Sequence, residues 1–511
     1  MAAGGFHKAF LIAYMAILFL VCVYALHRYQ LVHLYYKHRK NTPKLNACFL
    51  KLPRVTVQLP MYNEQYVAER IIETSCRIDY PRDKLEIQVL DDSTDETTTI
   101  ARRTVERMRA EGHNIVYIHR TNREGFKAGA LAHGMKTATG EFICIFDADF
   151  IPPRDILTKT IHYFTDPKVG MVQARWDHIN RNHSLLTQTQ AILLDGHFVI
   201  EHAARNRSGR FMSFNGTAGM WRKTCIEEAG GWQHDTLTED LDLSYRAQMK
   251  GWKFLFLPDL VSPAELPPEM QSFKAQQHRW AKGGAQTCKK LLPRILRSRL
   301  PWKIKMEAFF HLTSCTVYLY IVALTLMLYP AMRMRLSLFE DQQHLNNILF
   351  SISLFVIATC SPSAFYMASQ REIFHSWADK LKYLPFLMSV GIGIALNNAR
   401  ATLEGFFGKP GEFVRTPKYG VTASHDHRWR GRAKTFRYQI KLQPYVELAI
   451  AVYLLGCVVL ALRDGVALAG VPFIILFASG YLYVSLSTFY GQYVRGHETA
   501  THPADRSADA A

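Results

Sequence analysis

The sequence predicts an α/β domain inserted into a multi-pass α-helical membrane domain. The chain has 511 residues, and its 49% hydrophobic and 20% charged residues are a mixture expected when a water-soluble domain is joined to membrane spans. Long apolar stretches approach the roughly 20 residues that a helix needs to cross a bilayer. Between the first two of them, over residues 52–265, amphipathic segments alternate with five short β-rich runs: VTVQL, EIQVL, NIVYIH, EFICIF and MVQA. This alternation is typical of a largely parallel sheet covered by helices.

Five apolar stretches are predicted to span the membrane. They are Ala9–Leu26, Leu312–Pro330, Ile348–Ala368, Val446–Leu462 and Val466–Tyr483. A weaker sixth, residues 383–396, contains a proline and two glycines and could span, re-enter or lie along the interface. Residues 27–54 carry seven Lys or Arg and no acid, and residues 409–441 carry nine against two acids. Because basic loops stay in the cytoplasm, we expect five spans and a sixth segment that does not cross.

The formal net charge of +18 is explained by this topology and by attraction to anionic lipid headgroups. Nucleic-acid binding is not expected, because the basic runs adjoin apolar spans. The first apolar stretch is interpreted as a retained anchor, since a basic run follows it. Nine cysteines show no paired C-x-x-C spacing, so neither a zinc site nor a disulfide framework is indicated.

Acidic residues follow two predicted strands at the point where each strand ends. Asp91 and Asp92 come after EIQVL, and Asp147 and Asp149 come after FICIF. Ligands of such sheets bind outside the carboxyl ends of the strands. Two buried carboxylates repel each other, and a Mg²⁺ or Mn²⁺ ion, which takes carboxylate oxygens and shares its shell with phosphates, relieves that repulsion. The alternative for D-x-D is a solvated strand end. Ser93–Glu96 are expected to cap a helix, which leaves Asp91 and Asp92 unexplained.

Four motifs occur in an order that carries a family resemblance. They are Asp91–Asp92 in VLDDSTD, Asp147–Ala148–Asp149 in IFDADF, Thr238–Glu239–Asp240 in LTEDLDL, and QQHRW at 276–280, which matches Q-x-x-R-W. With them the chain resembles the processive family 2 glycosyltransferases, which include cellulose, chitin and hyaluronan synthases. It resembles in particular the plant-type cellulose-synthase-like branch that makes mannans and xyloglucan backbones. The resemblance covers most of residues 55–285 and, more loosely, the spans.

The resemblance implies a GT-A fold, a Rossmann-like nucleotide-sugar domain, in the cytosolic part of the chain. Asp91 or Asp92 would contact the nucleotide of the donor. Lys127, in FKAGAL, would lie near the donor phosphates. Asp147 and Asp149 would hold a Mg²⁺ or Mn²⁺ ion on the diphosphate.

The same resemblance implies the catalytic residues. Asp240, in one motif with Thr238 and Glu239, would be the general base that deprotonates an acceptor hydroxyl. Arg279 and the metal would oppose the negative charge of the departing diphosphate. An α-linked donor would then give a β-linked polymer, because a single displacement inverts the configuration.

The acceptor site is expected at two places in the sequence. Gln276 and Trp280 would line it at the mouth of a channel, and Gly216 and Thr217 would form a pocket near the acceptor terminus. Without the resemblance, Trp280 would be an interfacial aromatic anchor and residues 214–217 a plain turn.

The segment GEFVRTPKYG at 411–420 resembles the mobile gating loop of cellulose synthases. Thr416 and Lys418 would then reach toward the bound nucleotide. The match is partial, since FVRTPK stands in place of F-x-V-T-x-K. The alternative is an ordinary basic cytoplasmic loop.

These expectations give a domain order along the chain. It comprises an N-terminal transmembrane helix at 1–30, a GT-A glycosyltransferase domain at 52–265, interfacial helices with the Q-x-x-R-W motif at 266–310, two transmembrane helices at 311–369, an interfacial helix and gating-like cytosolic loop at 383–441, two transmembrane helices at 446–486 and a C-terminal tail at 491–511.

The main functional prediction is an enzyme that polymerises a β-linked polysaccharide from a cytosolic nucleotide sugar and moves the growing chain through its own spans. UDP-glucose, giving a β-glucan, is the preferred donor, and GDP-mannose, giving a β-mannan or glucomannan, is the alternative. A polyprenyl-phosphate sugar transferase and a non-catalytic nucleotide receptor are further alternatives. The expected location is a bacterial inner or plasma membrane, or the Golgi membrane of a eukaryote. The oligomeric state is left open.

Overall fold

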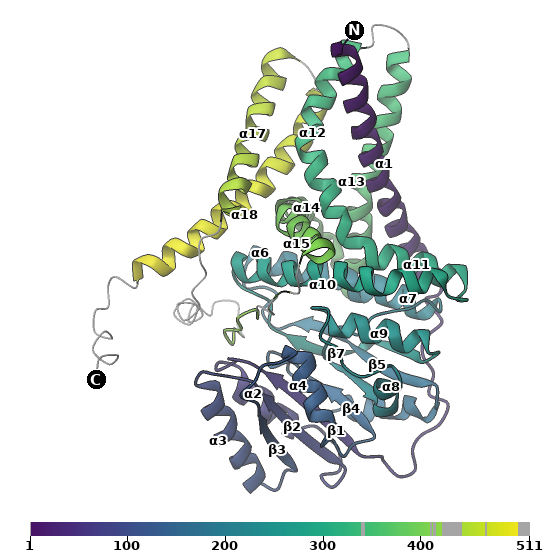
Figure 1. The fold of residues 1–511 in the computed structure, drawn as a ribbon, viewed down its shortest axis with the longest axis vertical. Coiled ribbons are helices and arrows are strands. Elements are labelled where there is room, and N and C mark those ends of the chain that lie inside the picture. Colours follow the sequence, from purple (N-terminus) through teal and green to yellow (C-terminus); the bar gives the residue numbers. More distant parts are fainter. Residues whose placement is uncertain are drawn as a thin grey trace.

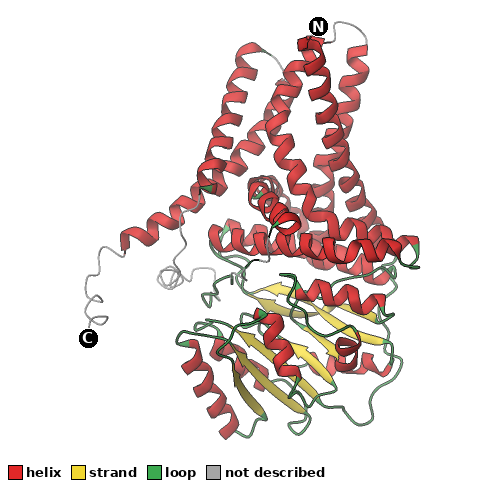
Figure 2. Ribbon diagram, in the orientation of Figure 1, coloured by secondary structure: helices red, strands yellow, loops and turns green. Residues whose placement is uncertain are grey.

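The sheet and the long apolar helices occupy opposite ends of the molecule. The computed structural model describes residues 2–338, 343–408, 411, 415–421, 442–465 and 468–498. The strands lie together in the lower part of the view, and the long helices rise above them (Figures 1 and 2). These helices are α1 (Ala2–Lys37), α12 (Val317–Leu338), α13 (Gln343–Ile373), α17 (Gln443–Asp464) and α18 (Val471–Glu498). The predicted fold class is confirmed.

The sheet has seven strands in the order β3-β2-β1-β4-β6-β5-β7. Their bounds are β1 Val55–Met61, β2 Leu85–Asp91, β3 Ile115–His119, β4 Phe142–Ile145, β5 Val169–His178, β6 Gly219–Arg222 and β7 Lys253–Ala264. Neighbouring strands are parallel except that β6 runs antiparallel to both β4 and β5. The five predicted strand regions correspond to β1–β5, whereas β6 and β7 were not predicted.

The central strands are buried on both faces. Every residue of β1, β2 and β4 is buried, as is typical of parallel strands covered by helices on both sides. One face packs on α2 (Ala68–Cys76) and α3 (Thr97–Ala110). The other face packs on α4 (Phe126–Met135) and on a layer that includes Leu31 and Leu34 from the end of α1. The first long helix is therefore part of the core that supports the sheet.

The remaining helices around the sheet complete the lower domain. They are α5 (Ile156–Ile161), η1 (His162–Thr165), α6 (Leu185–Asp195), η2 (Gly196–His202), α7 (Ala203–Arg207), α8 (Lys223–Glu228) and α9 (Glu239–Met249). α6 begins with a capping box in which Ser184 and Thr187 satisfy each other's backbone N–H groups. It continues without a break into η2, a π-helical turn, and turns of that kind recur at functional sites.

A long polar helix separates the sheet from the apolar helices. α10 (Met270–Arg297) runs horizontally across the view in Figure 1, above α9 and below the rising helices. α11 (Trp302–Thr313) and η3 (Ser314–Thr316) follow it and lead into α12. One face of α10 is thereby turned toward the carboxyl ends of the strands.

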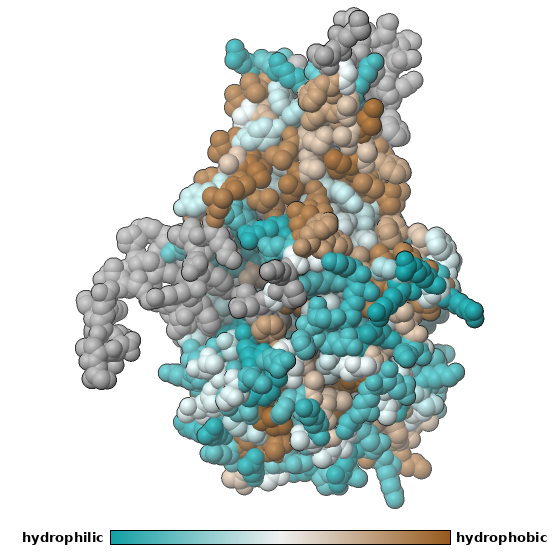
Figure 3. Space-filling model, viewed as in Figure 1, coloured by the Kyte–Doolittle hydropathy of each residue, from teal (hydrophilic) through white to brown (hydrophobic). Residues whose placement is uncertain are grey.

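The upper helices have the length and apolarity of membrane spans. Within the described residues, four segments qualify: Gly5–Lys37, Trp302–Met334, Gln443–Asp464 and Val471–Gln492. Figure 3 shows apolar side chains gathered over this upper part and polar ones over the sheet domain. The predicted span at 348–368 lies within α13, which packs along α1. The length and the apolar composition of these helices indicate a membrane protein.

The weak sixth apolar segment forms only short helices. η4 (Trp377–Tyr383) leads into α14 (Leu384–Gly393), and α15 (Ala395–Phe407) follows. Ten residues of helix extend only about 15 Å, half of the thickness of the hydrocarbon core. α14 packs on α18, α15 packs on α10, and both are drawn across the direction of the long helices in Figure 1.

The contact between α14 and α18 depends on two glycines. A Cβ atom on Gly480 would lie 2.1 Å from the Ser389 carbonyl oxygen, and one on Gly393 would lie 2.3 Å from the Gly480 carbonyl oxygen. We predict that Gly480→Ala lowers the stability of the purified protein by about 1–3 kcal/mol through overpacking. Thermal unfolding in detergent micelles measures the effect.

Gly456, in α17, is the matched control, because a Cβ there would meet no atom within 4 Å. Gly456→Ala is expected to leave the unfolding midpoint unchanged or to raise it, since alanine favours a helix. An equal midpoint for Gly480→Ala and the unmodified protein would show that the two helices do not approach this closely.

Candidate active site

A cavity lies at the carboxyl ends of β1 and β4 and extends to the first turn of α9 and to α10. Most of the residues that the sequence pointed to line it: Asp92, Lys127, Asp147, Asp149, Gly216, Thr238, Glu239, Asp240, Gln276, Arg279, Trp280, Thr416 and Lys418. Asp91 and Thr217 are next in sequence to the cavity residues Asp92 and Gly216 but do not line the cavity themselves. The fold therefore brings together residues from all four motifs.

The two aspartates after β4 are each paired with a lysine. Lys127 forms an ion pair with Asp147 and donates a second hydrogen bond, of 2.9 Å, to the Gly216 carbonyl oxygen. Lys418 donates to Asp149 over 2.6 Å. These cations offset the repulsion between two carboxylates one residue apart.

The two aspartates after β2 have different surroundings. The Asp91 carboxylate is fully buried and accepts hydrogen bonds from the Ser93 N–H at 2.9 Å and from the Tyr117 hydroxyl at 2.6 Å. Asp92 accepts hydrogen bonds from the Nε and from one terminal nitrogen of the Arg120 guanidinium, at 2.7 and 2.5 Å, and faces the cavity. Asp91 fixes the turn behind the cavity wall, and Asp92 is the one of the pair that a ligand can reach.

The first turn of α9 supplies two acids to the cavity. Thr238 is the N-cap residue, and Glu239 and Asp240 open the helix. Burial, followed by the negative charge of Glu239, raises the pKa of Asp240 to about 7, although Lys127 opposes the shift. Burial also raises the pKa of Glu239. A carboxyl group with a pKa near 7 can accept and release a proton at neutral pH.

The tight turn at Gly216 lies between the side chains of Asp240 and Lys127. Gly216 adopts φ +82°, and a Cβ atom there would lie 3.0 Å from the Asp240 Oδ2 and 3.3 Å from the Lys127 Nζ. The neighbouring Thr217 hydroxyl accepts a 2.9 Å hydrogen bond from the Asp147 N–H. The positive φ favours glycine at 216, and a Cβ there would press on both side chains, while the Thr217 hydroxyl supports the end of β4.

One face of α10 closes the cavity on the side of the apolar helices. Gln276, Arg279 and Trp280 are three and four residues apart, so they share a helix face, and all three line the cavity. Burial lowers the pKa of the Arg279 guanidinium, while the carboxylates of Glu239 and Asp147 oppose that shift. The positive charge is therefore aimed at the acidic residues.

The segment 415–421 packs into the cavity mouth. Lys418 donates to the Glu265 carbonyl oxygen at 2.9 Å as well as to Asp149. The Glu265 carboxylate accepts the backbone N–H groups of Tyr419 and Gly420, each at 2.9 Å. Of the two predicted loop residues, Lys418 thus contacts the D-x-D motif and Thr416 lines the cavity. Apart from 415–421 and Gly411, the residues of 409–441 lie outside the described ones.

Several cavity residues were not among the predicted site residues. Glu64 faces Arg415 at 3.3 Å, and burial raises the pKa of its carboxyl to about 8 against the effect of Arg415. Glu265 and Asn215 also line the cavity. Glu64 belongs to a polar run directly after β1, which is a usable signal. Glu265 follows a strand that was not predicted, so no sequence pattern indicated it.

Asp147 and Asp149 could hold a divalent cation together with ligand oxygens. Among the described residues, no group of three His, Cys, Asp or Glu side chains forms a metal site. The D-x-D carboxylates are suitable ligands for Mg²⁺ or Mn²⁺, which commonly keeps water and phosphate oxygens in its shell. The two lysines on these carboxylates show that the site attracts positive charge.

Comparison with known proteins agrees with this geometry. A family model described as Glycosyltransferase like family 2 matches residues 53–283. Glucomannan 4-beta-mannosyltransferase 7 of Arabidopsis thaliana is 34% identical over 418 residues, which cover 79% of this chain and 71% of that protein. The chain belongs to glycosyltransferase family 2. A second enzyme of that plant, glucomannan 4-beta-mannosyltransferase 2, is 44% identical to this glycosyltransferase over 252 residues, 48% of this chain and 47% of the other.

A solved structure confirms the GT-A type of fold. The mannosyltransferase PcManGT from Pyrobaculum calidifontis, determined with GDP-Man and Mn²⁺, covers 79% of this chain with a TM-score of 0.52 and 22% identity, over 99% of its own length. Together with the plant relatives, these findings confirm the cellulose-synthase-like resemblance. This family 2 glycosyltransferase is a hexosyltransferase that uses a nucleotide sugar and makes a β-linked polysaccharide.

We predict that Gly216→Ala lowers kcat about 10- to 100-fold, because the added Cβ displaces Asp240 and Lys127 from each other. Gly231→Ala is the matched control, since Gly231 also has a positive φ, +70°, but a Cβ there meets nothing within 4 Å. Both variants carry similar backbone strain, and only the first should lose turnover. Equal activity of the two variants would contradict a close approach at Gly216.

Proposed function

We propose that this glycosyltransferase is a GDP-mannose-dependent synthase of a β-mannan or glucomannan, with Asp240 as its general base. The observation that carries the proposal is the pairing, in one cavity, of a carboxyl group with pKa about 7 and the D-x-D aspartates of β4. Activated sugar transfer needs these two functions, removal of a proton from the acceptor and stabilisation of a departing diphosphate.

Asp240 and Glu64 both have a raised pKa, but Glu64 is ion-paired with Arg415 at 3.3 Å, whereas the Asp240 carboxylate borders the Gly216 turn; Asp240 is therefore our candidate for the base. Its raised pKa makes the ionised form a stronger base than an ordinary aspartate, and at neutral pH about half of it is available. The acceptor hydroxyl oxygen attacks the anomeric carbon, the bond from that carbon to the diphosphate breaks, and the hydroxyl proton passes to Asp240. One displacement inverts the configuration, so an α-linked donor gives a β-linked product.

The charge of the departing diphosphate is met by cations already directed at the site. Lys127 and Lys418 lie on Asp147 and Asp149, and Arg279 faces the same acids from α10. A Mg²⁺ or Mn²⁺ ion held by Asp147 and Asp149 would, when bound, add Lewis-acid stabilisation of the diphosphate. The lysines can then turn from the aspartates to the phosphate oxygens, because their side chains are long and rotatable.

The choice of donor rests on the relatives. The two plant relatives described above are named glucomannan 4-beta-mannosyltransferases. They favour the mannose alternative over UDP-glucose, which the sequence alone had put first. The likeness to PcManGT supports the fold, and the donor assignment depends on the plant relatives.

The acceptor is proposed to approach along α10. Gln276 and Trp280 line the cavity on the side of the apolar helices, and an indole face is suited to stacking on a sugar ring. A growing chain held there would have its end hydroxyl directed at Asp240. The apolar helices above α10 are then the route by which the product leaves, and lipids surround them.

The pH dependence of turnover tests the role of Asp240. Asp240 must be ionised to accept a proton, so kcat should fall as the pH drops below about 7 and level off above it. Because the charge of Glu239 contributes to the raised pKa, Glu239→Gln should move the acidic limb to lower pH. Asp240→Asn should lower kcat at least about 100-fold at every pH. A limb that does not move in Glu239→Gln would contradict this assignment.

The donor is tested with purified protein in lipid vesicles containing Mg²⁺ or Mn²⁺. Labelled GDP-mannose and UDP-glucose are supplied separately and together, and alkali-resistant polymer is digested with linkage-specific glycanases. We expect incorporation from GDP-mannose into β-linked polymer, absent in Asp240→Asn. Incorporation from UDP-glucose alone would overturn the donor assignment, and label confined to extractable lipid would overturn polymer synthesis.

A further inference from the structure

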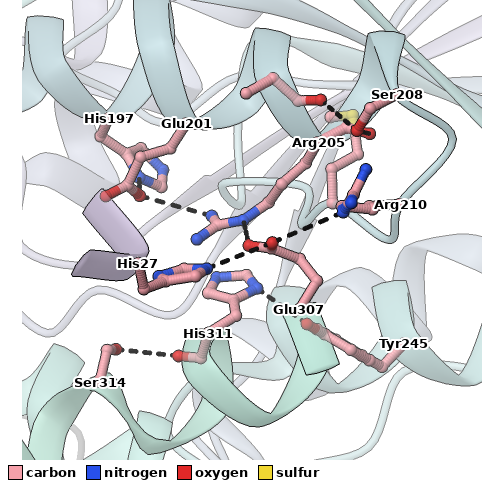
Figure 4. A network of polar contacts seen from close by, with 12 residues as sticks. His27, His197, Glu201, Arg205, Ser208, Arg210, Tyr245, Glu307, His311 and Ser314 are labelled. Carbon is pink, nitrogen blue, oxygen red and sulfur yellow. Dashed lines mark hydrogen bonds and ion pairs between the residues drawn. The ribbon is translucent and has the colours of Figure 1, made fainter. Parts of the chain in front are cut away.

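A partly buried polar network lies behind the turn that contains Gly216. Figure 4 shows His197, Glu201, Arg205, Glu307 and His27 close together, contributed by η2, α7, α11 and α1. His197 and Glu201 do not line the cavity, and the residue that connects them with it is Asn215. The Asn215 side chain is held on both sides, by His197 at 3.0 Å and by His202.

The ionised state of Glu201 fixes the proton of His197. Burial opposes ionisation, but Arg205 and His197 outweigh it and hold the pKa of Glu201 below its ordinary value. The Glu201 carboxylate accepts a hydrogen bond from His197 Nδ1 at 3.0 Å. A carboxylate cannot donate, so Nδ1 carries the proton, and in the neutral imidazole Nε2 is an acceptor.

The same logic fixes the orientation of Asn215. The His197 Nε2 lies 3.0 Å from the Asn215 Nδ2, so the amide donates to the imidazole. The Asn215 Oδ1 then accepts from His202 Nε2, whose ring is fully buried. Burial lowers the pKa of His202 well below its ordinary value, which keeps that ring neutral. Each contact in the row from Glu201 to His202 thus joins one donor to one acceptor.

We propose that His197 and His202 are positioning residues of this glycosyltransferase, which hold Asn215 and thereby set the place of the Gly216 backbone between Lys127 and Asp240. The Gly216 carbonyl oxygen accepts a 2.9 Å hydrogen bond from the Lys127 ammonium. A Cβ atom on Gly216 would lie 3.0 Å from the Asp240 carboxylate, so the backbone of Gly216 borders that group. The Asn215 backbone N–H is fixed independently by the Gln173 side chain at 3.1 Å. Without its side-chain contacts, Asn215 would lose two of these anchors, and the turn at Gly216 would be held less firmly.

The network continues from His197 to the first apolar helix. Arg205 contacts Glu201 at 3.4 Å and donates to Glu307 at 2.9 Å, and Glu307 is 3.2 Å from His27 of α1. The side chain of Glu307 is only 1% exposed, so its charge requires these partners. The proposal places the catalytic turn at one end of a row of contacts whose other end is a membrane helix.

Two substitutions at His197 separate the two bonds of its ring. In His197→Gln the terminal amide takes the place of Nε2 and can still accept from Asn215, but the contact with Glu201 is lost. In His197→Asn the amide takes the place of Nδ1 and can still donate to Glu201, but the contact with Asn215 is lost. The two variants are matched in size and polarity and differ in which partner they keep.

The test measures kcat of polymer formation and the thermal unfolding midpoint for both variants in vesicles or micelles. We expect His197→Gln to keep most of the wild-type kcat and His197→Asn to lose about 10-fold or more, at similar midpoints. A role limited to stabilising the Glu201 and Arg205 contacts predicts the opposite order, with His197→Asn the better enzyme. That order, or equal kcat in both variants, would overturn the proposal.

The inference rests on the assignment of Asp240 and Lys127 to catalysis under the proposed function. The comparison uses whichever donor supports turnover in the wild-type protein, so an error in the choice of mannose does not affect it. His202→Gln, which can still donate from its amide to Asn215 Oδ1, should retain activity, whereas His202→Leu should lose it. Retention of full kcat in His202→Leu would also overturn the proposal.

Discussion

The repulsion among carboxylates that face one cavity is the constraint on which the rest of this structure depends. Glu64, Asp147, Asp149, Glu239 and Asp240 all line the same space. Like charges at short range in a partly dry site would drive the elements apart or force protonation. The cations that prevent this come from separate elements: Lys127 from α4, Arg279 from α10, and Arg415 and Lys418 from the segment after α15.

The carboxylates of the cavity are only partly balanced by cations, and the chemistry of the proposed function depends on this imbalance. Asp147 and Asp149 each have a lysine partner, whereas Asp240 shares its surroundings with Glu239 and has the Lys127 ammonium only at a distance. Burial, together with the charge of Glu239, therefore raises the pKa of Asp240 to near neutrality, while the D-x-D pair attracts cations. Under the proposed function, one cavity thus combines a carboxylate that accepts a proton with two carboxylates that attract the cations needed to bind phosphate.

The sheet and the membrane helices are held in a defined position relative to each other by two sets of contacts. α10 carries three cavity residues on one face and packs against α15 on the other side. The end of α1 enters the core of the sheet domain through Leu31 and Leu34. The Gly216 turn and the membrane helices are consequently held in one packed unit, and under the proposed function an acceptor chain along α10 would meet Asp240 without a flexible joint.

Local patterns in the sequence determined the strands β1–β5, the D-x-D and T-E-D motifs, the shared face of Gln276, Arg279 and Trp280, and the apolar helices. These depend on spacing within a few residues, which the chain itself fixes. The tertiary structure alone decided that Asp91 is a buried support, that Glu265 anchors the segment 415–421, and that His197 supports Asn215. Such contacts join residues far apart in the chain, and only the packing of β6, β7 and η2 brings them within hydrogen-bond distance.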